Sequence, residues 1–149
     1  MTPDAANNFG GLPLGNAWAH GEPVALVTID SMQLLECRLI KLDIEGMEPD
    51  AVRGAELTIR RLRPLLYVEN DRDDRSAELI ALLLSYGYRL YWHAPMLYRQ
   101  NNFAGDPENI FANIASYNML CVPREAGIAI DGLTEVAGPL DSWRRAPVF

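Results

Sequence analysis

Apolar and polar positions along the chain follow two periods, which predict an alternation of short strands and helices. Short, mostly apolar runs that end at a polar residue predict strands at residues 24–29, 38–43, 65–69, 88–92 and 117–122. Helical spacing predicts helices at residues 48–62 and 76–86. The run at 38–43 is apolar on both faces except for Lys41, which is typical of a strand covered by helices on both sides.

The first predicted helix has clear start and stop signals. Pro49 suits the first helical turn, and the acids beside it complement the positive end of the helix dipole. One apolar face follows, and its members are Val52, Ala55, Ile59 and Leu62. Three arginines precede Pro64, which ends the helix, so we expect one continuous helix here. Gly87 is a C-terminal cap for the second helix.

The order strand, helix, strand, helix, strand predicts an α/β fold with a largely parallel sheet and helices on its faces. No long helix separates the strands at 88–92 and 117–122, so we expect the last strand to be antiparallel. We divide the chain into an irregular lead-in at 1–23, a domain at 24–123 and a tail of unassigned structure at 124–149. Residues 94–116 form a long connection of the kind that often carries function.

Composition narrows the class of protein. The chain has 149 residues, of which 49% are hydrophobic and 22% charged, as in an ordinary globular domain. A net charge of −7 disfavours nucleic acid or an anionic membrane as the main partner. No apolar run is long enough to cross a bilayer, and no secretory signal precedes the first strand, so we expect a cytoplasmic protein. Cys37 and Cys121 then fit as reduced thiols.

Polar side chains gather where the predicted strands end. Ligands of open α/β sheets bind outside the carboxyl ends of the strands, so these side chains are candidate site residues. They are Asp43, Glu45, Glu48, Glu69, Asn70, Asp71, Trp92 and His93. Such groups can hold a sugar hydroxyl, an amine or a divalent cation, or act as a general base. The competing interpretation is that the acids merely end strands and cap neighbouring loops.

His93 and one further candidate, Asn102, are open to two interpretations each. His93 is either a structural histidine or a base beside an aromatic wall formed by Trp92 and Tyr91. Asn102 either serves a turn or binds substrate. Other chemistries lack their motifs: there is no Gly-x-Ser-x-Gly elbow, zinc-ligand spacing or P-loop, and the glycines at 10, 11 and 15 do not form a dinucleotide loop.

An ordered series of motifs runs along most of the chain. The series includes LIKLDIEGME at 39–48, VRGA at 52–55 and PLLYVE at 64–69. It continues through YRLYWH at 88–93, NNF at 101–103, NIF at 109–111 and NMLCVP at 118–123, with NFGG at 8–11 and TID at 28–30 upstream. This series resembles the FkbM-type methyltransferases, in which an IKxDxEGxE strand end precedes a helix with a GA segment.

The resemblance implies a class I methyltransferase fold, with a Rossmann-like sheet and S-adenosylmethionine as methyl donor. The usual acceptor would be a hydroxyl group on a sugar or another natural product. Asp43 would lie near donor and acceptor and would orient or deprotonate the acceptor, with His93 as a second catalytic candidate. The substrate-binding candidates are Glu45, Glu48, Glu69, Asn70, Trp92 and Asn102.

The chain departs from the family pattern upstream of these motifs. Family members carry there a glycine-rich loop for the donor, and the expected sheet is therefore only the C-terminal part of the domain. Such a sheet would expose an apolar edge that can pair with a second copy or another chain. The alternative hypothesis is a non-catalytic remnant or interaction module without a donor site. A third hypothesis is a divalent-metal site formed by Asp43, Glu45, Glu69 and His93.

Overall fold

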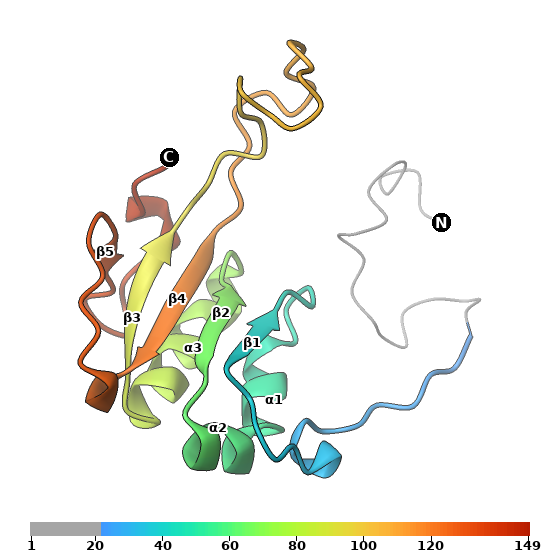
Figure 1. Ribbon diagram of the computed structural model, residues 1–149, viewed down its shortest axis with the longest axis vertical. Coiled ribbons are helices and arrows are strands. Elements are labelled where there is room, and N and C mark those ends of the chain that lie inside the picture. Colours follow the sequence, from blue (N-terminus) through green and yellow to red (C-terminus); the bar gives the residue numbers. More distant parts are fainter. Residues whose placement is uncertain (1–21) are drawn as a thin grey trace.

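The computed structural model describes residues 22–149, which form a five-stranded mixed sheet with three α-helices (Figure 1). The strands are β1 (Leu39–Leu42), β2 (Leu65–Glu69), β3 (Tyr88–His93), β4 (Asn118–Pro123) and β5 (Thr134–Glu135). The helices are α1 (Glu48–Arg53), α2 (Glu56–Leu62) and α3 (Asp73–Ser85). Four of the five strands predicted from the sequence and the helix near 76–86 are confirmed within a few residues. The predictions for residues 1–21 lie outside the described residues.

The strands lie in the order β1-β2-β4-β3-β5. β1 and β2 are parallel, whereas β4 is antiparallel to both β2 and β3, and β5 is antiparallel to β3. The antiparallel direction of the strand near 117–122 is therefore confirmed. The prediction of a largely parallel sheet is wrong, because only the β1–β2 pairing is parallel. β2 and β3 run in the same direction, but β4 lies between them and is antiparallel to both.

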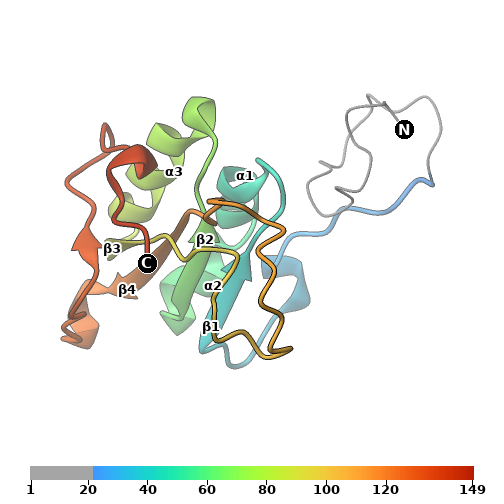
Figure 2. The same cartoon turned by 90° about the horizontal axis from the view of Figure 1, so that it is seen from above.

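α1 and α3 pack on the same face of the sheet (Figures 1 and 2). That face carries the largest part of the apolar core, where Val68, Met119 and Trp92 of three neighbouring strands are buried together with Leu79 and Leu83 of α3. Among the described residues, no helix covers the other face of β1 and β2, so the predicted helices on both faces are not found there. β1 is an edge strand in this part of the chain, and Leu39 is 57% exposed.

The helix predicted at 48–62 is interrupted after Arg53, at Gly54 and Ala55. Asp30 causes this break from outside the helix. Its backbone N–H donates to the Gly54 carbonyl at 2.9 Å, and its carboxylate accepts from the amides of Leu57 and Thr58 at 3.0 and 2.7 Å. These two amides lie in the first turn of α2, so Asp30 caps a new helix start. The prediction of one continuous helix was wrong because the capping residue is distant in sequence.

The segment before the 3₁₀ helix Asp30–Met32 is not a strand. Residues 22–28 are exposed and pair with no described strand, which corrects the strand predicted at 24–29. Apolar, β-branched residues form a strand only when they pair with a neighbouring strand, and residues 22–28 pair with none that the structure describes. Across residues 22–149, no helix combines the length and the hydropathy required to cross a membrane.

The chain beyond β4 belongs to the same sheet and core. β5 pairs with β3, and Val136 and Ala146 join the apolar core. The last residues run beside the end of β3, where Ala94 and Val148 form a bridge and the Met96 amide donates to the Phe149 carbonyl. The connection at residues 94–116 projects beyond the ends of β3 and β4 (Figure 1). The tail left unassigned from the sequence therefore completes the sheet at its β3 side.

Candidate functional site

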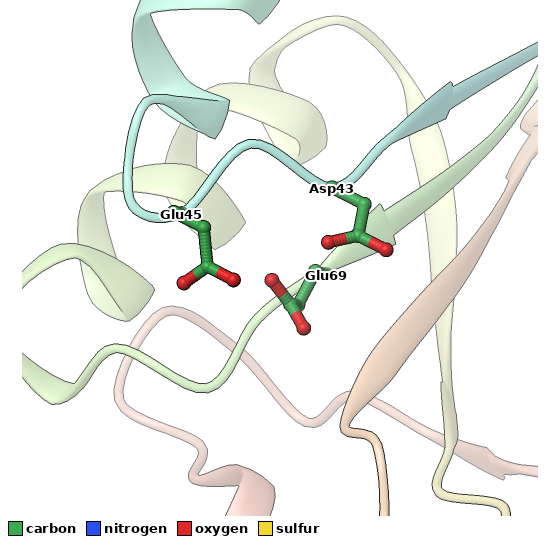
Figure 3. A group of neighbouring side chains, drawn as sticks. All are labelled: Asp43, Glu45 and Glu69. Atoms are coloured by element: carbon green, nitrogen blue, oxygen red, sulfur yellow. The ribbon is translucent and has the colours of Figure 1, made fainter. Parts of the chain in front are cut away.

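Three carboxylates meet at the carboxyl ends of β1 and β2. Asp43 directly follows β1, Glu69 ends β2, and Glu45 lies in the loop that leads to α1 (Figure 3). Parallel pairing of Leu42 with Val68 brings the two strand ends side by side. One carboxylate oxygen from each residue lies within 4.8 Å of the others. We call these three residues the acidic cluster; the sequence predicted all of its members.

The loop between β1 and α1 presents Glu45 to this cluster. Glu45 and Gly46 adopt positive φ angles of 57° and 97°, which a residue with a side chain rarely adopts. The Glu48 carboxylate stabilises this turn by accepting from the Ile44 amide at 2.9 Å and the Gly46 amide at 3.0 Å. Glu48 is buried, and both of its carboxylate oxygens are engaged. Its position is therefore that of a loop support rather than a side chain directed at a ligand.

Two cations compensate part of the charge of the cluster. Lys41, on the same face of β1, donates to Asp43 at 2.6 Å, and Arg72 forms an ion pair with Glu45. Within residues 22–149, Glu69 has no ion-pair partner. Burial raises the pKa of Glu69 to about 7, and repulsion from neighbouring carboxylates, with Asp43 first, acts in the same direction. The carboxyl group of Glu69 thus exchanges a proton near neutral pH.

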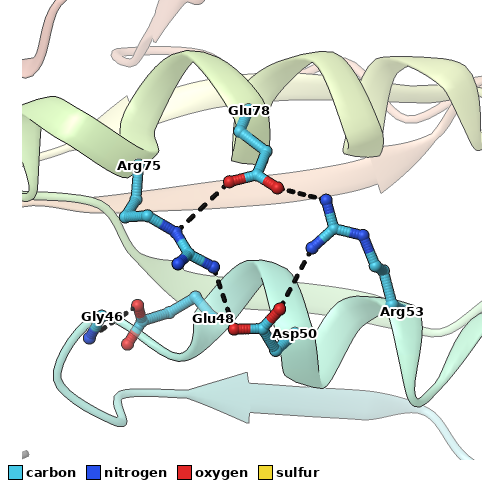
Figure 4. A network of polar contacts seen from close by, with 6 residues as sticks. All are labelled: Gly46, Glu48, Asp50, Arg53, Arg75 and Glu78. Atoms are coloured by element: carbon cyan, nitrogen blue, oxygen red, sulfur yellow. Dashed lines mark hydrogen bonds and ion pairs between the residues drawn. The ribbon is translucent and has the colours of Figure 1, made fainter.

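An ion-pair ring fixes the helix that follows the loop (Figure 4). Asp50 of α1 binds Arg53 at 3.2 Å and Arg75 of α3 at 2.9 Å. Glu78 of α3 closes the ring by pairing with Arg75 at 3.2 Å and with Arg53. Each exposed pair contributes little by itself. The ring nevertheless joins α1 to α3 at the point where α1 emerges from the loop that carries Glu45.

His93 lies at the end of β3 on the same face of the sheet as the acidic cluster. Asn118 of β4 pairs with Glu69 on one side and with His93 on the other. Nδ1 of His93 is 2.7 Å from the Tyr67 hydroxyl, and its ring stacks on Phe149 with centroids 6.4 Å apart. Lys41, Arg72 and Tyr67 were not recognised from the sequence. The period of two was the available signal, because it places Lys41 with Asp43 and Tyr67 with Glu69.

Trp92 and Asn70 point to the opposite, helix-covered face. Trp92 is 1% exposed, and its indole N–H donates to Asp141 at 3.2 Å. The Asn70 side chain is buried and donates to the sulfur of Met119 at 3.3 Å. The structure therefore does not place Trp92 in an aromatic wall beside the acids. The aromatic rings that accompany His93 are Tyr67 and Phe149.

Asn102 lies in the projecting connection, away from the acidic cluster. Its amide donates to the carbonyls of Arg99 and Asp106 at 3.0 and 2.7 Å, and its oxygen accepts from the Asp106 amide at 3.1 Å. These bonds close a turn, which is one of the two interpretations given for Asn102.

The cluster can attract positive charge or hydroxyl groups. Three carboxylates within 4.8 Å of one another can accept hydrogen bonds from hydroxyls and amines, and they can enclose a divalent cation. Because Lys41 and Arg72 already bind two of them, the unpaired capacity is concentrated at Glu69.

The fold and this site define an α/β protein with an acidic site at the carboxyl ends of neighbouring strands. The family model of the methyltransferase FkbM domain matches residues 3–90, more than half of the chain. The protein belongs to this family. No curated protein and no solved structure matches the chain.

Proposed function

We propose that the protein takes part in S-adenosylmethionine-dependent methyl transfer to a hydroxyl group of a sugar or another natural product. Membership of the FkbM family supports methyltransferase chemistry. The observation that carries the proposal is the acidic cluster itself, which lies where ligands of open α/β sheets bind. Its residues come from the family motif at 39–48 and from the end of β2.

The directions of the strands support a partial class I methyltransferase sheet. β1, β2 and β3 run the same way, and β4 runs the opposite way between β2 and β3. Three strands that end at the same rim bring Asp43, Glu69 and His93 to one side of the sheet. A Rossmann-like sheet would continue beyond β1, which is an edge strand in the described part of the chain.

The chemistry of the cluster fits the proposed donor. When bound, S-adenosylmethionine supplies a methyl group on a positively charged sulfur. Carboxylates near that charge are favourable, and Glu69 has no cation of its own among the described residues. Asp43 and Glu69 would therefore face the charged end of the donor or the acceptor hydroxyl beside it.

Within this proposal, Asp43 orients the acceptor and accepts the proton of its hydroxyl group. The ion pair with Lys41 holds the Asp43 carboxylate at the end of β1. Methyl transfer depends mainly on in-line placement of the acceptor and the sulfur, so orientation is the larger contribution. We expect Asp43→Asn to lower kcat/KM by about 10²-fold or more in a donor-competent assembly. An unchanged kcat/KM would refute this role.

Calorimetric titration with S-adenosylhomocysteine tests donor binding directly. Saturable one-to-one binding by the folded chain would support the proposal, and Glu69→Gln should then weaken the affinity. Absence of heat from a folded sample would show that this chain does not bind the donor by itself. Family membership would stand in either case, because it rests on the sequence match.

The alternative function is that of a non-catalytic remnant or interaction module. The edge position of β1, with Leu39 exposed, favours this alternative, because an unpaired edge can add a strand from a second copy or another chain. Light scattering distinguishes the two cases together with the titration. A dimer that binds no donor supports the interaction module, whereas a monomer that binds donor excludes it.

A further inference from the structure

Tyr67 and His93 form a polar pair next to the acidic cluster. Tyr67 precedes Glu69 by two residues on β2, so both side chains lie on the same face of the sheet. His93 reaches this face from β3, with β4 between the two strands. The hydroxyl of Tyr67 and Nδ1 of His93 are 2.7 Å apart, which is a hydrogen-bond distance.

The proton in this hydrogen bond belongs to the tyrosine. Burial raises the pKa of Tyr67, and the nearby Asp43 adds to this effect, so the phenol stays protonated at neutral pH. Among the described residues, Nδ1 of His93 is the hydrogen-bond partner of this hydroxyl. If Nδ1 carried the proton instead, the half-buried phenolic O–H would have no acceptor in that part of the chain, which is unfavourable. Nδ1 therefore accepts, and the proton of neutral His93 is on Nε2.

The rings of Tyr67 and Phe149 fix the orientation of the His93 imidazole, so that its Nε2–H can donate a hydrogen bond in one direction. Tyr67 meets its ring with an interplanar angle of 60°, and Phe149 stacks on it at 24°. Nε2 has no hydrogen-bond partner within residues 22–149. A neutral imidazole whose Nδ1 is engaged presents Nε2–H to a ligand and is not a base at that nitrogen.

We propose that Tyr67 is a positioning residue that directs Nε2–H of His93 towards an oxygen atom of the acceptor. This proposal rests on the proposed function, because it assigns a second contact to the same acceptor. Glu69 and His93 are separated by one strand, so their backbones lie about 10 Å apart. An acceptor with several oxygens can therefore bind the carboxylates at one end and His93 at the other.

Nitrogen-15 NMR of the imidazoles tests the positioning role without any substrate. The chain contains two histidines, and His93→Gln identifies the signals of His93. We expect a protonated Nε2 and a hydrogen-bonded, unprotonated Nδ1 at mildly basic pH. In Tyr67→Phe, Nδ1 should lose its hydrogen-bond shift. The matched control is Tyr98→Phe, which removes a hydroxyl that donates to the Asp106 and Pro107 carbonyls. A protonated Nδ1, or an identical spectrum in Tyr67→Phe, overturns the positioning role.

Titration with methyl α-D-glucopyranoside tests the binding role in the same samples. A saturable shift of the Nε2–H signal is expected in the unmodified protein. Tyr67→Phe should weaken this binding about fivefold, equivalent to roughly 1 kcal/mol, whereas Tyr98→Phe should leave it unchanged. Absence of the shift at Nε2 in the unmodified protein, or equal binding by Tyr67→Phe, overturns the binding role. Failure of the donor titration, in contrast, would count against the proposed function and leave these NMR results valid.

Discussion

Replacing Glu69 by glutamine should stabilise the protein at neutral and basic pH. Burial and the neighbouring carboxylates oppose the charge of Glu69 and raise its pKa from an ordinary value of 4.5 to about 7 in the folded protein. Below pH 4.5 the group is protonated in both states and has no effect on stability. Between pH 4.5 and 7 the unfolded chain releases the proton first, so the free energy of unfolding falls as pH rises.

The size of the effect follows from the two pKa values. The difference between about 7 and 4.5 corresponds to about 3.4 kcal/mol, at 1.36 kcal/mol for each pH unit. Solvent reaches part of the Glu69 side chain and screens the repulsion, so we expect about 1–2 kcal/mol. For a chain of 149 residues, that change raises Tm by about 2–8 °C.

Urea denaturation of the original protein and Glu69→Gln between pH 3 and pH 8.5 measures this difference. The matched control is Glu125→Gln at the opposite end of the sheet, where a hydrogen bond from Arg63 lowers the pKa of Glu125. Its sign is reversed: the control variant should be less stable at neutral pH, and the difference should disappear as the pH falls through the pKa of Glu125. If Glu69→Gln were no more stable at pH 8 than at pH 4, relative to the original protein, the raised pKa inferred from the burial of Glu69 and from its neighbouring carboxylates would be wrong.

Three further substitutions and the addition of magnesium test the packing and charge of the same structure. Tyr88→Phe should lower the free energy of unfolding by about 1–2 kcal/mol, because the buried Tyr88 hydroxyl donates to the Pro64 carbonyl at 2.8 Å. Tyr91→Phe should be neutral or stabilising, because the buried Tyr91 hydroxyl has no hydrogen-bond partner among the described residues. Chemical denaturation of the two variants measures this difference. Asp30→Ala should lower the free energy of unfolding by about 1–2 kcal/mol, because it removes the cap of α2. A variant that is as stable as the original protein in urea denaturation would exclude the capping role. Magnesium should leave Tm unchanged, because cationic side chains already bind two members of the acidic cluster; a rise in a thermal melt would instead indicate a metal site.

Local patterns were sufficient to predict most elements of the sheet. β2 was predicted with its exact bounds, because its apolar run starts after Pro64 and ends at a carboxylate. The direction of β4 was also predictable, because residues 94–116 contain no helix to carry the chain back across the sheet. These predictions depend only on neighbouring residues, which determine where a strand can start and end.

The errors arose where a distant residue decides the local structure. The break at Gly54 depends on Asp30, whose carboxylate and amide both bind this region. A Cβ atom at Gly54 would lie only 3.3 Å from the Thr28 side chain, so the segment that carries Asp30 also packs closely against Gly54. The apolar pattern of residues 48–62 is that of one helix, and nothing within it indicates the interruption.

The predicted site residues divide into two groups, because adjacent strand-end residues direct their side chains to opposite faces of the sheet. Adjacent residues of a strand point to opposite faces, so Trp92 enters the core while His93 joins the rim, although they are neighbours in sequence. Glu69 and Asn70 differ in the same way at the end of β2. The sequence identified the strand ends, but the prediction placed both residues of each adjacent pair in one site. The polar residues at the strand ends therefore lie on two different faces of the sheet. The register with β4 determines which of them lie on the same face and can contact one ligand.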